Sequence, residues 1–193
     1  ILSDSSSKLN ADVIEGKVNL TLNNGTWNGD NAGEVIATNG NWTGENNGTV
    51  TLTNVAWMGD NNGEANVTGG IWNGDNTGTA TLTDVNWSKD NSGTLTFNGK
   101  ATWSGNNIGD NAIVTMTKES KWEGSNKGSN ATIIMENNTW HGNNNGVNTT
   151  ITLEGAEWQG DNTAQATTVT LDSSATWKGY NIANDFALNL NNS

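Results

Sequence analysis

The ten tryptophans of this 193-residue chain recur at a nearly constant spacing. Consecutive ones are 15, 15, 15, 15, 16, 19, 18, 18 and 19 residues apart. Self-similarity at a fixed period is typical of repeat proteins, in which each unit packs only against its neighbours. The spacing therefore predicts a solenoid with one indole per coil. The tryptophans are Trp27, Trp42, Trp57, Trp72, Trp87, Trp103, Trp122, Trp140, Trp158 and Trp177.

A short pattern follows every tryptophan. Gly comes two residues later in nine of ten repeats, Asn four residues later in all ten, and Gly six residues later in eight. Because Gly and Asn tolerate positive φ, we expect a tight turn once per coil, with the Asn amides also bonded to each other along the axis. The asparagines of this expected ladder are Asn31, Asn46, Asn61, Asn76, Asn91, Asn107, Asn126, Asn144, Asn162 and Asn181.

Apolar and polar residues alternate before each tryptophan. In residues 49–53, Val50 and Leu52 share one side while the three threonines share the other, as in a half-buried strand. A second short strand carries Trp57, with small residues two positions before the tryptophan in most repeats and polar residues beside it. Because polar residues flank each tryptophan, the alternation places the indole on the inner side. It favours a buried indole stack over the alternative, an exposed aromatic row that would stack on sugar rings.

These patterns predict an all-β fold, a single-stranded parallel β-helix (β-solenoid) of about ten coils of 15–19 residues. Residues 1–15 lack the repeat and are expected to be a lead-in or a partial coil, and residues 16–193 to be solenoid repeats cut from a longer solenoid. From Trp103 onward the added residues fall between the turn and the next strand, which predicts a wider coil there and suggests a third strand.

Composition excludes several kinds of function. With no Cys, the chain has no disulfide, thiolate metal site or cysteine nucleophile. A net charge of -12 argues against nucleic acid as a partner, because such binding depends on Lys and Arg contacts to phosphate. No apolar run approaches the length of a membrane span, so we expect no membrane contact by this segment.

Acidic residues recur three positions after the tryptophans. Asp30, Glu45, Asp60, Asp75 and Asp90 would stack into a column of like charge, which is a weak candidate for calcium. The repeats lack the GGxGxDxUx spacing of calcium-binding nonapeptides. A solvated acidic edge is therefore the favoured interpretation, and we predict no metal and no cofactor.

Two further features are candidate sites. Outward threonines such as Thr79, Thr81 and Thr94 form an array that an ice-binding solenoid would display. The array is interrupted at Glu34, Ile36, Glu64, Asn66, Ile134 and Glu154, so β-propensity on an exposed face is the better explanation. The single histidine, His141, occupies a variable exposed position beside Trp140 and has no partner for a nucleophilic triad. No catalytic residue is predicted.

Segments such as NLTLNNGTWNG (residues 19–29) and LNLNNS (residues 188–193), with Trp-x-Gly repeats and no Cys, resemble passenger domains of Gram-negative autotransporters. The resemblance implies a right-handed parallel β-helix secreted by the type V route to the outer membrane or the medium. It also implies a β-barrel translocator elsewhere in the full chain. Passenger coils are usually longer than 15 residues, which sets the N-terminal half apart from the family.

The leading functional hypothesis is a non-enzymatic adhesin or structural stalk. Its expected partners are another copy of itself, a host-surface glycan or a matrix protein. The alternatives are a glycan-binding or glycan-cleaving β-helix of the tailspike type and an ice-binding solenoid.

Overall fold

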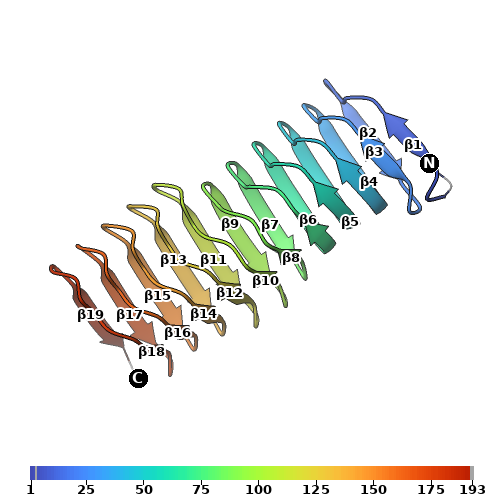
Figure 1. The fold of residues 1–193 in the computed structure, drawn as a ribbon. Helices are drawn as coiled ribbons and strands as arrows, with labels where there is room; N and C mark the ends of the chain where they lie inside the picture. The colour runs from blue at the N-terminus through green and yellow to red at the C-terminus, as the bar shows by residue number, and fades with distance from the viewer. Residues whose placement is uncertain (3, 192–193) are drawn as a thin grey trace.

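The computed structural model describes residues 1–2 and 4–191, and these form a straight rod of stacked coils with strands and no helix (Figure 1). The expected all-β parallel solenoid is confirmed, with about 11 turns. The strands are β1 Lys8–Asn10, β2 Lys17–Thr21, β3 Thr26–Asn28, β4 Glu34–Thr43, β5 Thr49–Met58, β6 Glu64–Trp72, β7 Thr79–Thr83, β8 Asn86–Trp87, β9 Thr94–Asn98, β10 Thr102–Trp103, β11 Ile113–Thr117, β12 Lys121–Glu123, β13 Thr132–Glu136, β14 Thr139–His141, β15 Thr150–Glu154, β16 Glu157–Gln159, β17 Thr168–Asp172, β18 Thr176–Lys178 and β19 Ala187–Asn191.

Each coil contributes two segments to the rod. The first, five residues long, pairs in parallel with its counterpart in the next coil, and these segments together are called here the five-residue sheet. The second carries the tryptophan and builds the Trp sheet. In β4, β5 and β6 the two segments run together as one strand. At a strand spacing of about 4.8 Å, 11 turns give a rod roughly 50 Å long.

The core is a column of indoles. Nine tryptophans are 0–1% exposed, whereas Trp177, near the last coil, is only partly buried. Neighbouring rings are stacked with centroids 4.5–5.2 Å apart and planes within 12° of parallel. These distances exceed van der Waals contact between carbon atoms, about 3.5–4 Å. The rings are therefore offset, the arrangement that aromatic quadrupoles favour.

The lengthened coils keep the same core, and most of their added residues lie at the corner that precedes the five-residue segment. Asp110, Asn111 and Ala112 precede β11, and Asn111 has a φ of 61°. Equivalent positions in later coils, such as Asn130 and Asn148, also have positive φ. The predicted place of the insertion is confirmed, but in the described residues it forms a turn rather than a third strand.

The residues before the first tryptophan extend the stack. Leu9 in β1 pairs with Trp27 of β3, and Val13 bridges to Asn31. Residues 8–13 therefore place an aliphatic side chain in the indole column and another in the asparagine column.

The expectation of positive φ in the turn after each tryptophan was wrong for its asparagines. None of the ten has a positive φ. The glycines there are required by close approach of stacked backbones: a Cβ on Gly59 would lie 1.8 Å from the carbonyl oxygen of Gly44. Left-handed residues instead form the bend between the two sheets, three positions before the tryptophan, as at Asn39 (φ 58°) and Asn54 (φ 54°).

Candidate functional surfaces

The ten asparagines of the predicted ladder lie in line with one another, and nine of them are inside the rod. Each of the first nine donates from Nδ2 to Oδ1 of the next, at 2.7–2.8 Å. All but Asn181 are fully buried. The amide column is therefore an internal element of the stack and is not offered to a ligand.

The indole N–H groups are also occupied. Trp57 Nε1 donates to the Gly44 carbonyl at 2.9 Å, and Trp122 Nε1 to the Gly105 carbonyl at 2.8 Å. Every tryptophan makes the same bond to a backbone carbonyl of the preceding coil. The accepting residue lies two positions after the tryptophan of that coil, or two positions after Leu9 in the first coil. With their rings buried, the tryptophans give no sugar-stacking platform. The alternation of apolar and polar residues predicted the burial of the tryptophans, but it did not predict this hydrogen bond.

The acidic column exists and lies at the surface, and most of its members also accept a backbone hydrogen bond from the next coil. Asp30 Oδ1 accepts a hydrogen bond from the backbone N–H of Glu45 at 2.8 Å, and Asp60 Oδ1 accepts one from that of Asp75, also at 2.8 Å. Asp75 and Asp90 make the same contact to the next coil. In later coils Asn and Ser replace the acids and still accept from the next backbone N–H. Eight coils thus place a short side-chain oxygen acceptor at this position, whereas the longer Glu45 makes no such bond within the described residues.

Within the described residues, no group of three or more His, Cys, Asp or Glu side chains is arranged to hold a metal ion. No helix in the described part of the chain could span a membrane.

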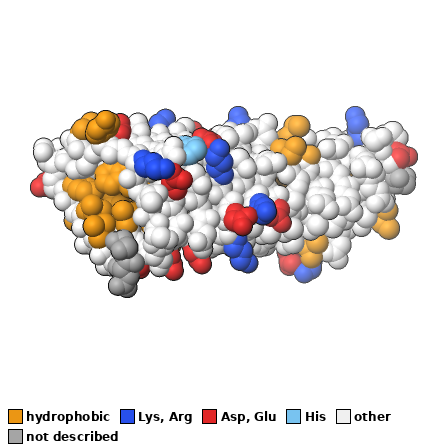
Figure 2. Space-filling view, turned by 90° about the horizontal axis from the view of Figure 1, so that it is seen from below, with side chains coloured by type: hydrophobic (Ala, Val, Ile, Leu, Met, Phe, Trp, Pro, Cys, Tyr) orange, Lys and Arg blue, Asp and Glu red, His pale blue; other side chains and the backbone are white. Residues whose placement is uncertain are grey.

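One charged patch lies on the Trp sheet towards the C-terminal end. Glu123 contacts Lys121 and lies 3.1 Å from His141 Nδ1, and Lys178 Nζ lies 2.5 Å from Glu157 Oε1. Figure 2 shows blue, red and pale-blue side chains close together on this side of the rod. The hydrogen bond from Lys121, with the nearby His141, lowers the pKa of Glu123, and the bond from Lys178 lowers that of Glu157.

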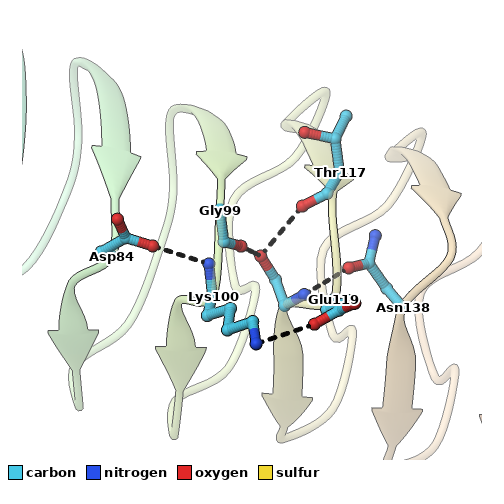
Figure 3. Close-up of polar contacts among 7 residues, drawn as sticks. Asp84, Gly99, Lys100, Thr117, Glu119 and Asn138 are labelled. Atoms are coloured by element: carbon cyan, nitrogen blue, oxygen red, sulfur yellow. Dashed lines mark hydrogen bonds and ion pairs between the residues drawn. The ribbon is translucent and has the colours of Figure 1, made fainter.

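A second charged cluster marks the corner where the coil length changes (Figure 3). Asp84 Oδ1 accepts from the backbone N–H of Lys100 at 2.8 Å, and Lys100 Nζ lies 3.2 Å from Glu119 Oε2. Beneath them the Ser120 hydroxyl donates to the Gly99 carbonyl at 2.6 Å. These bonds close a bend that carries one extra residue. The Lys100 and Glu119 side chains are 79% and 70% exposed, so their pairing contributes little to stability.

The five-residue sheet presents three outward rows of side chains. Its middle row reads Asn19, Ile36, Thr51, Asn66, Thr81, Thr96, Thr115, Ile134, Thr152, Thr170 and Asn189. No charge interrupts this row along the rod. The face offers a flat, regular surface rather than a cleft with converging catalytic groups.

Comparison with protein-family models, with curated proteins and with solved structures finds no match to this chain.

Proposed function

We propose that the chain is a non-enzymatic adhesive rod of the autotransporter-passenger type, displayed on or released from the surface of a Gram-negative bacterium. One observation carries the proposal: parallel pairing continues from β1 to β19, so that each outward position recurs at every coil along one axis (Figure 1). Repeated weak contacts along such an axis add up when the partner is also extended. This suits adhesion better than binding of one small molecule.

The rod's partner under this proposal is an extended surface: another copy, a glycan layer or a matrix protein. The net charge of -12 opposes contact between copies. Salt screens charges beyond about 8 Å at physiological ionic strength. Self-association should therefore increase as salt is added.

The test is to display the chain on bacterial cells through a heterologous translocator and measure cell aggregation and adhesion to glycan- and matrix-coated surfaces. The matched control displays an unrelated passenger of similar length. We expect adhesion or aggregation above the control, and salt-promoted oligomers of the purified rod in ultracentrifugation. A folded, displayed rod that adheres to nothing and stays monomeric at every salt concentration would contradict the proposal. Release of reducing ends from a polysaccharide panel would contradict its non-enzymatic part.

A further inference from the structure

Six consecutive strands of the five-residue sheet carry two adjacent outward rows made almost entirely of threonine. They occupy the first and third positions of β7, β9, β11, β13, β15 and β17, which gives twelve sites, and we call this surface the Thr face. Ten sites are threonine and two are isoleucine. The sites are Thr79, Thr81, Thr94, Thr96, Ile113, Thr115, Thr132, Ile134, Thr150, Thr152, Thr168 and Thr170.

Strand pairing fixes these side chains in a two-dimensional lattice. Thr81 pairs with Thr96, and Thr96 with Thr115, so one side chain follows the next at each coil step of about 4.8 Å. Within a strand the two rows are separated by two residues, roughly 6.6 Å. The second and fourth residues of each strand are buried in the core on the other side of the backbone, which holds this spacing. A rigid lattice gains from repeated contacts only if its partner is periodic as well.

The Thr face is uncharged on a strongly acidic rod. None of its twelve sites carries a charge, although the chain has a net charge of -12. The nearest acids in the same strands, Glu136, Glu154 and Asp172, lie in the third row at the edge of the sheet. In the first row, charges occur only before this region, at Lys17, Glu34 and Glu64. The charged residues that interrupt the threonine array in the linear sequence therefore lie outside the Thr face.

The hydroxyl groups of the face are left to solvent. Within the described chain only one of the ten, that of Thr170, makes a hydrogen bond, accepting from Asn189 Nδ2 at 3.4 Å. Threonines elsewhere use their hydroxyls internally: Thr149 donates to the Gly146 carbonyl, and Thr167 to the Ala164 carbonyl. The Thr face therefore presents methyl groups and unpaired hydroxyls to water at fixed positions.

We propose that the Thr face binds the surface of ice. Ice is an extended partner in addition to those of the proposed adhesive rod, so this inference goes beyond that function. Waters that bridge the hydroxyls lose entropy when they are immobilised, and in a crystal that cost has already been met. A charge on the face would instead keep its own tight hydration shell. A crystalline polysaccharide is also periodic and neutral, but sugar rings are usually held by exposed aromatic side chains, and the tryptophans here are inside.

The test uses the purified rod and two double variants. Thr81→Lys with Thr115→Lys places charges in the middle of the Thr face, two coils apart. Thr43→Lys with Thr176→Lys adds the same charges to exposed sites of the Trp sheet. Circular dichroism and tryptophan emission establish that each is folded, and Thr152→Lys alone replaces the first double variant if that one unfolds. Freezing-point depression, uptake into growing ice and retention on crystalline cellulose are then measured.

We expect the wild-type rod and the Trp-sheet variant to lower the freezing point below the melting point and to enter ice, and the Thr-face variant to lose both properties. Exclusion of the wild-type rod from ice overturns the proposal, as does equal activity of the two variants. Cellulose retention lost only in the Thr-face variant would assign the face to polysaccharide and also overturn it. Adhesion measured well above freezing tests the adhesive rod separately, because it can persist when ice binding is absent.

Discussion

Removing one buried amide tests whether the asparagine column stabilises the stack. Asn76 is fully buried, and its Nδ2 donates to Asn91 Oδ1 at 2.7 Å and to the carbonyls of Gly78 and Thr94 at 3.2 Å. Its own Oδ1 accepts from Asn61 Nδ2 at 2.8 Å. Asn76→Ala therefore removes a link that two neighbouring coils share.

The expected cost follows from the groups left behind. Asn91 Oδ1 keeps only a 3.3 Å contact from the Gly93 N–H, and Asn61 Nδ2 keeps two carbonyl acceptors at 3.0 and 3.2 Å. A buried partner left unsatisfied costs about 1–3 kcal/mol, so the two weakened neighbours together predict a loss of roughly 2–4 kcal/mol in the free energy of unfolding. Asn76→Asp should cost at least as much, because it buries a carboxylate.

The matched control is Asn62→Ala. Asn62 follows Asn61 of the asparagine column in the chain but lies outside the column. Asn62 Nδ2 donates to Asn47 Oδ1 at 3.0 Å and its Oδ1 accepts from Thr77, but this outer pair of bonds is exposed to water. We expect Asn62→Ala to cost about 0.5 kcal/mol or less.

Urea unfolding followed by tryptophan emission gives the midpoints, and hydrogen exchange locates the loss. In the Asn76→Ala rod, the amides of the adjoining coils should lose protection first, because each coil contacts only its neighbours. If the two alanine variants unfold at the same urea concentration, water satisfies the inner amides as well as the protein does, and the reasoning fails.

Two further predictions concern the glycines and the carboxylates. Gly59→Ala should destabilise the rod by about 3 kcal/mol or more in urea unfolding, because its Cβ would meet a backbone carbonyl oxygen at 1.8 Å that cannot move without breaking the stack. Gly16→Ala, where a Cβ meets nothing within 4 Å and only a φ of 77° is strained, should cost about 1 kcal/mol, and an equal loss in both would show that conformation rather than contact selects glycine. The pKa values of Glu123 and Glu157 lie below their usual 4.5, so the stabilisation they provide is present above pH 4.5 and is lost as the pH falls through the folded-state values. The double variant Glu123→Gln with Glu157→Gln should therefore flatten the acid side of a plot of Tm against pH, by a small amount since both groups are exposed, and an unchanged slope would rule out this linkage.

The sequence predicted the columns of the core because each position is occupied by the same residue type in nearly every coil. The alternation around Val50 and Leu52 was enough to place Trp57 inside. Residues 1–15 were harder, because Leu9 and Val13 fill the columns with different residue types, so pattern matching on Trp and Asn could not find their coil.

The reason for a recurring residue was harder to predict than its position. Gly two residues after the indole suggested a special backbone angle, whereas the structure shows that Gly59 is needed for close contact between coils. The left-handed bend three residues before nine of the ten tryptophans had a signal in the sequence, since Asn24, Asn39 and Asn54 occupy it in successive coils. The acid at Asp60 suggested charge, but the bond it makes requires only a short side-chain acceptor. Only the contacts between coils distinguish these explanations, and those contacts cannot be read from the linear sequence.

The outward residues carry a different kind of information, because the core does not dictate them. On the Trp sheet, outward sites adjacent to the indoles range from Ile71 to Lys121 and Glu157, so a charged or an apolar side chain is tolerated there. The middle row of the five-residue sheet contains only Thr, Asn and Ile over its whole length. Strand propensity favours Thr and Ile but disfavours Asn, and it favours Val and Tyr, which are absent. Propensity alone therefore does not explain the row, whereas contact with a neutral, ordered surface would select uncharged side chains along it.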